Sequence, residues 1–134
     1  MTAPLPRVLL VEPQFVLRRT IAMVARDLGM VDFYEASNVG RARTLFAADA
    51  LDRLVLDVQE GAQVMELLSD LRRGRFATPP DVRVVVLATD GKPVDEARLQ
   101  ALGVTRVLGK PVRISDLLAA IADAQAPGGA LPGR

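Results

Sequence analysis

The chain has 134 residues, half of them hydrophobic, which is the size and composition of one compact domain rather than of a disordered segment. Its formal net charge of +1 gives no reason to expect binding to nucleic acid or to an anionic membrane. The absence of cysteine and histidine excludes disulfides, Cys/His zinc sites, Ser-His-Asp chemistry and a phosphohistidine relay. Apolar runs are far shorter than the ~20 residues that span a bilayer, so we expect a soluble cytoplasmic protein.

Short β-branched runs alternate with helical patterns along the chain. The strands predicted from apolar runs are 7–11, 31–36, 54–56 ending at Asp57, 82–88 and 104–108. The helices predicted from apolar residues three or four positions apart are 17–28, 42–46, 64–71, 95–102 and 114–121. Gly29 and Gly103 are predicted to end the first and fourth helices.

Five strand–helix repeats predict an α/β fold, a flavodoxin-like doubly wound five-stranded parallel sheet in the order 2-1-3-4-5 with helices on both faces. We place the domain at 7–124, with flexible tails at 1–6 and 125–134. The cluster of Arg72, Arg73 and Arg75 at the end of the third helix is interpreted as a solvated helix terminus.

Polar residues stand at the predicted carboxyl ends of the strands, where sites lie in open parallel sheets. Glu12, Asp57 and Lys110 follow the first, third and fifth strands, and Ala88-Thr89 end the fourth. Two carboxylates and an ammonium group that converge can hold a hard cation and orient a phosphoryl group. Polar residues also end strands simply because the chain leaves the core there, but the coincidence of Asp57 with Lys110-Pro111 favours a site.

Four stretches in this order, 8–12, 54–57, 84–88 and 101–111, make the chain similar to the receiver domain of two-component response regulators from residue 7 to 124. The resemblance implies that Asp57 accepts a phosphoryl group from a phosphohistidine on a sensor kinase. It also implies that Lys110 contacts the phosphate and that the Lys110–Pro111 peptide bond is cis.

The metal-binding positions of the family are incomplete in this sequence. The resemblance implies Mg²⁺ ligands at Glu12, at Asp57 and at the backbone carbonyl of Gln59. Pro13 stands where the family usually has a second acidic residue, so we expect Mg²⁺ to bind weakly or not at all. Glu60 could replace the lost ligand, although a surface role in the loop is the better interpretation.

The switch positions of the family are also altered. Ungapped counting from Lys110 puts Ala88 where the family has Thr or Ser, and Thr89 could substitute only if the backbone has already turned there. Val107 stands where an aromatic residue is common. Phosphate on Asp57 would then have little differential interaction with two conformations, and we expect the domain to stay in one.

Two functions therefore remain open, neither of them an enzyme activity. The first is a stand-alone receiver domain that accepts phosphate on Asp57 from a sensor histidine kinase or phosphotransfer protein. It would signal to a separate effector through the fourth helix, fifth strand and fifth helix, 95–125, or through a homodimer, because we expect no output domain after residue 126. The second is a phosphorylation-independent pseudo-receiver, a constitutive protein-interaction module.

Two further alternatives fit the sequence less well. A haloacid-dehalogenase-type phosphatase needs a second Asp two residues after its nucleophile, and that position is Gln59. A flavodoxin needs a Ser/Thr/Gly phosphate loop after the first strand, where this chain has Glu12-Pro13-Gln14-Phe15.

Overall fold

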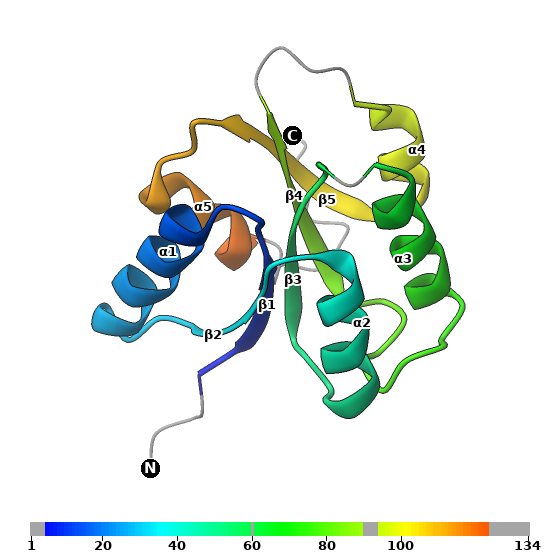
Figure 1. Cartoon of the computed structure of the whole chain (residues 1–134), viewed down its shortest axis with the longest axis horizontal. Helices are drawn as coiled ribbons and strands as arrows, with labels where there is room; N and C mark the ends of the chain where they lie inside the picture. The colour runs from blue at the N-terminus through cyan, green and yellow to red at the C-terminus, as the bar shows by residue number, and fades with distance from the viewer. Residues whose placement is uncertain (1–4, 60, 90–93, 124–134) are drawn as a thin grey trace.

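A computed structural model describes residues 5–59, 61–89 and 94–123. In it, strands and helices alternate through the whole domain (Figure 1). The strands are β1 (Arg7–Val11), β2 (Asp32–Ala36), β3 (Arg53–Asp57), β4 (Arg83–Thr89) and β5 (Val104–Lys110). The helices are α1 (Phe15–Asp27), α2 (Val39–Ala48), α3 (Ala62–Arg72), α4 (Glu96–Ala101) and α5 (Ile114–Asp123). The expected tails fall outside the described residues, except for residues 5 and 6.

All strand pairs in the described residues are parallel, and the sheet order is β2-β1-β3-β4-β5, as the sequence predicts. Leu9 pairs with Leu54 across β1 and β3, which excludes the antiparallel pairing that would contradict this fold. The order places β2 and β5 at the two edges. The carboxyl ends of β1, β3 and β4 therefore lie side by side, and β5 ends next to β4.

Helices cover both faces of the sheet and bury one apolar layer on each (Figure 1). Helices α1 and α5 pack on one face, with Ile21 and Leu117 fully buried against strand residues such as Val55. Helices α2, α3 and α4 cover the other face, where Phe46 and Leu67 are fully buried. Strands buried on both faces explain the uninterrupted apolar runs in the sequence.

The predicted boundaries are right to within a few residues, and the differences matter at two strand ends. β4 and β5 continue to Thr89 and Lys110, which pair with each other, because their backbone ladder extends past the apolar run. Helix α1 ends at Asp27, and Gly29 follows with a φ of 66°, the left-handed conformation that glycine adopts most easily. None of the described helices is long and apolar enough to cross a membrane.

The interpretation of the arginine cluster at the end of α3 is wrong for one of its three members. Arg73 and Arg75 are exposed. The Arg72 guanidinium instead donates hydrogen bonds to four backbone carbonyl oxygens in residues 80–82 and 102–103. The acceptors belong to Leu102 at 2.7 Å, Val82 at 2.7 Å, Pro80 at 2.8 Å and Gly103 at 3.1 Å. Arg72 therefore joins three segments that lie far apart in the sequence.

Candidate functional site

The carboxyl edge of the sheet brings together the three charged residues that the sequence singles out. Glu12 directly follows β1, and its backbone N–H still donates to Ala36 of β2, so the residue stays in line with the sheet. Asp57 is the last residue of β3, and Lys110 is the last residue of β5. The Lys110 side chain reaches past the end of β4 to both carboxylates.

One ammonium group bridges the two carboxylates. Lys110 Nζ lies 2.7 Å from Glu12 Oε1 and 2.6 Å from Asp57 Oδ2. The side chains of Glu12 and Asp57 are 0% and 1% exposed, and that of Lys110 is 13% exposed. We call these three residues the ion triad. Its two negative groups are almost completely removed from water, and the ammonium is their direct counter-charge.

The remaining carboxylate oxygens accept hydrogen bonds from the backbone. The N–H of Gln14 donates to Glu12 Oε2 at 3.0 Å, and the N–H of Gln59 donates to Asp57 Oδ1 at 2.7 Å. Each donor lies two residues after its acceptor, a local turn that holds a carboxylate in place. Asp57 therefore has one oxygen fixed by its own loop and the other directed at Lys110.

The charges around Lys110 decide its protonation state. Burial by itself would lower the pKa of the ammonium, because a charged group is less stable away from water. Hydrogen bonds and charge attraction from Asp57 and Glu12 outweigh that effect and raise the pKa above its ordinary value. Lys110 is therefore a permanent cation at neutral pH.

The arrangement of the triad does not fit a resident Mg²⁺ ion. One oxygen of each carboxylate accepts a backbone hydrogen bond, whereas Glu12 Oε1 and Asp57 Oδ2 are buried without a hydrogen bond of ordinary geometry. The ammonium lies between these two oxygens at ion-pair distance from both. Pro13 offers no third carboxylate, and the described residues contain no cluster of three or more potential metal-binding side chains. Gln59 contacts Asp57 through its N–H, while Glu60 lies outside the described residues.

The positions expected to switch lie near the ends of β4 and β5, as counting back from Lys110 predicts. Ala88 is buried, and Thr89 is an exposed residue of the extended strand, so the backbone has not turned by residue 89. The condition under which Thr89 could replace the missing hydroxyl is therefore not met. Val107 is partly buried and packs against the core layer under α4. The Lys110–Pro111 bond is cis, as the resemblance predicts.

Arg18 is a neighbour of the site that sequence reasoning missed. Its Nη1 donates to the backbone carbonyl of Glu12 at 2.9 Å, and its Nε donates to Glu35 of β2 at 3.2 Å. Arg19 also forms an ion pair with Glu35. Arg18 thus ties α1 to the two strand ends beside the triad. Nothing in the sequence distinguishes it from the other fifteen arginines and lysines that the motif does not name.

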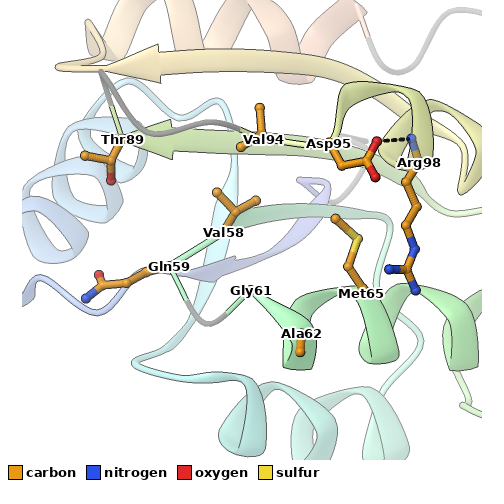
Figure 2. A pocket seen from close by; sticks show the side chains of 9 residues that line it. All are labelled: Val58, Gln59, Gly61, Ala62, Met65, Thr89, Val94, Asp95 and Arg98. Atoms are coloured by element: carbon orange, nitrogen blue, oxygen red, sulfur yellow. Dashed lines mark hydrogen bonds between the residues drawn. The ribbon is translucent and has the colours of Figure 1, made fainter.

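A pocket of about 290 Å³ opens beside the loop that follows Asp57 (Figure 2). Gln59 and Thr89 lie at one end of it, and Met65 and Arg98 lie at the other. The backbone N–H of Arg98 donates to Asp95 Oδ1 at 3.0 Å and so begins α4 at the pocket wall. Sequence reasoning missed this pocket because its walls come from two loops and two helices that are distant in the chain.

Solved structures with the same fold are numerous. A response regulator from Thermotoga maritima is 23% identical, with a TM-score of 0.74 over 90% of this chain and 98% of that chain. A CheY-like response regulator receiver domain protein from Methanospirillum hungatei JF-1 is 19% identical, with a TM-score of 0.76 over 90% of this chain and 93% of that chain. A DNA-binding response regulator of the LuxR family from Staphylococcus aureus is 18% identical, with a TM-score of 0.77 over 91% and 100%.

These likenesses establish that the chain has the receiver-domain fold of response regulators, the flavodoxin-like arrangement that the sequence predicts. No protein-family model matches the sequence, and no curated protein sequence matches it significantly. At these identities the likeness extends to the fold alone, and the chemistry of the site depends on the side chains at the carboxyl edge.

Proposed function

We propose that this chain is a receiver domain of two-component signalling that accepts a phosphoryl group on Asp57. The observation that supports this most directly is the position of Asp57 Oδ2, at the carboxyl edge of the sheet and 2.6 Å from Lys110 Nζ. A carboxylate with an adjacent ammonium can attack phosphorus while the cation offsets charge on the phosphoryl oxygens.

In the proposed reaction, a bond forms between Asp57 Oδ2 and phosphorus as the bond from phosphorus to the donor breaks. The electron pair of that bond leaves with the donor, which is an imidazole nitrogen of a phosphohistidine or the acetate oxygen of acetyl phosphate. The product is an acyl phosphate on Asp57. Lys110 stays protonated throughout and contacts the transferred group, while the N–H of Gln59 holds Asp57 Oδ1 in place.

A protein partner is part of this proposal. Phe15, Val16 and Met23 are exposed on α1, and Phe15 begins that helix three residues after Glu12. A group of exposed apolar side chains on the helix that follows Glu12 is a candidate surface for docking a protein that donates the phosphoryl group. On the other side of the sheet, the edge strand β5 presents Thr105 and Gly109 to solvent, which supports effector binding at α4, β5 and α5.

Mass spectrometry of the intact chain after incubation with acetyl phosphate tests the acceptor. We expect one added phosphoryl group on the unaltered protein and none on Asp57→Ala. Asp52→Ala is a matched control, because Asp52 is exposed at the opposite end of β3. Phosphate that remains on Asp57→Ala, or its complete absence from all three proteins, would contradict the proposal.

A pseudo-receiver function is the second candidate, and Ala88 and Val107 favour it. Neither side chain can form a hydrogen bond to a phosphoryl group. A phosphate on Asp57 would therefore contact no side chain at these two positions that could change the position of α4. This protein would then bind its partner constitutively, and the affinity would be the same for the unaltered chain and for Asp57→Asn. The phosphatase alternative is weaker, since the side chain of Gln59 cannot act as a general acid.

A further inference from the structure

The ion triad already contains a cation between the two buried carboxylates that would hold a divalent metal. Lys110 Nζ is within hydrogen-bonding distance of Glu12 Oε1 and Asp57 Oδ2 at once, and both carboxylates are at least nine-tenths buried. With one positive and two negative groups, the site carries a net charge of −1. Only a single negative charge is therefore left for any further cation to neutralise.

We propose that the Lys110 ammonium is the resident cation of this site and takes the place of a divalent metal ion. A consequence, which rests on the proposed function, is that phosphoryl transfer to Asp57 proceeds without added Mg²⁺.

Geometry and charge both support this substitution. Mg²⁺ needs near-octahedral oxygen ligands at about 2.0–2.1 Å, and it gives up its bound water reluctantly. To reach Glu12 Oε1 and Asp57 Oδ2 it would have to displace an ammonium that is held at 2.6 and 2.7 Å. A metal that entered beside the ammonium would instead be repelled by it at short range, in a place with little water to screen the charges.

The backbone reinforces the same arrangement. The N–H groups of Gln14 and Gln59 donate to the second oxygen of each carboxylate, so neither carboxylate can rotate toward a metal without losing a hydrogen bond. Lys110 is fixed at the end of β5 by its pairing with Thr89. Backbone hydrogen bonds thus hold one oxygen of each carboxylate, and ion pairs with Lys110 hold the other, at backbone positions set by the sheet.

Metal titration of the full chain tests the inference independently of phosphorylation. Binding of Mn²⁺ is followed by the loss of the free-ion electron paramagnetic resonance signal, and Mg²⁺ is then added as a competitor. We expect no saturable site in the unaltered protein. Lys110→Met and Pro13→Asp each bring the site to a net charge of −2, and each should bind at least about tenfold more tightly than the unaltered chain. Arg41→Met, an exposed change on α2 with the same loss of charge as Lys110→Met, should bind no better than the unaltered chain.

Two results would overturn the inference. One is saturable Mg²⁺ binding by the unaltered protein at submillimolar concentration. The other is a folded Lys110→Met that gains no affinity while Pro13→Asp does, because the number of ligands, not the resident ammonium, would then limit binding. If Lys110→Met does not fold, the unaltered chain decides by itself. Its thermal unfolding midpoint should be the same with Mg²⁺ or with a chelator, and a Mg²⁺-dependent increase contradicts the inference.

Labelling with acetyl phosphate in the presence and absence of Mg²⁺ distinguishes this inference from the proposed function. Acetyl phosphate should label Asp57 to a similar extent with Mg²⁺ and with a chelator. Labelling that requires Mg²⁺ overturns the inference and leaves the acceptor role intact. The absence of labelling in both conditions refutes the acceptor role, while the titration still decides whether Lys110 is the resident cation.

Discussion

Two of the partly buried cations of the domain, Lys110 and Arg72, have surroundings that are opposite in kind. At the carboxyl edge of the sheet, Lys110 faces the carboxylates of Glu12 and Asp57. At the end of α3, Arg72 faces four backbone carbonyls, which carry dipoles but no net charge. Both cations connect chain segments that are distant in sequence, yet only the first has carboxylate oxygens as partners.

The pKa of Arg72 is lowered and that of Lys110 is raised, because their partners differ in charge. Burial lowers the pKa of Arg72, and the charge of Asp81 only partly offsets the effect, since the carbonyls around the guanidinium contribute no full charge. Burial acts in the same direction on Lys110, but two adjacent carboxylates reverse the net shift. Arg72 is therefore a structural tie, whereas Lys110 is part of an ionic site whose charge a ligand can change.

The largest effect is expected for removal of Lys110. Lys110→Met leaves two buried carboxylates without their counter-charge, and we expect the free energy of unfolding to fall by about 3–5 kcal/mol. Urea unfolding followed by circular dichroism measures the loss. Arg41→Met, an exposed arginine on α2, should change stability by less than about 0.5 kcal/mol. A loss no greater for Lys110→Met than for this control would show that the triad is weakly coupled to the fold.

A smaller effect is expected at the second cation. Arg72→Leu removes donors from four carbonyls but leaves no unpaired charge, so the free energy of unfolding should fall by about 2–3 kcal/mol. Arg73→Leu is the matched control, because Arg73 is the adjacent and exposed residue. Equal stability of the two variants would mean that the Arg72 contacts contribute nothing to the free energy of unfolding, and Arg72 would then not be a structural tie.

The raised pKa of Lys110 predicts that the stability of the domain depends on pH. Its folded-state pKa lies above the unfolded value of 10.5, so the ammonium stabilises the fold fully below about pH 10.5. That contribution is lost as pH rises through the higher folded-state pKa. The difference in unfolding free energy between the unaltered chain and Lys110→Met should be constant from neutral pH to pH 10 and decrease beyond it. A difference that grows with increasing pH has the wrong sign.

The smallest effect is expected for switching. Ala88 and Val107 give a phosphate on Asp57 no hydroxyl and no aromatic ring through which to favour a second conformation, and a shift from mostly one state to mostly the other needs about 5 kcal/mol of differential interaction. Amide NMR spectra with and without beryllofluoride should therefore differ only near Asp57. Shifts that spread through Val107 to α4 would show a functioning switch.

The fold and the triad could be predicted from the sequence, for reasons that particular residues make clear. Val84 to Leu87 form an apolar run because the strand is buried on both faces, and Asp57 is conspicuous because it ends such a run. The role of Arg72 could not be predicted, because its acceptors are backbone carbonyls in two other segments. Every residue has such a carbonyl, so the residue types at these positions do not indicate the contact. Strand order predicts that Lys110 lies near Glu12 and Asp57, but not that its ammonium contacts both carboxylates at once, because strand order does not say how far a side chain reaches.

The contact between Arg72 and Gly103 has a consequence for how such a chain can vary. Gly103 has a φ of 79°, and a Cβ added there would lie 3.0 Å from Arg72 Nη2. A side chain at position 103 would therefore meet both backbone strain and the guanidinium. Loss of the arginine would remove one of these two constraints and keep the other. Among chains descended from a common ancestor, positions 72 and 103 should consequently show correlated substitution, with arginine at the first accompanied by glycine at the second.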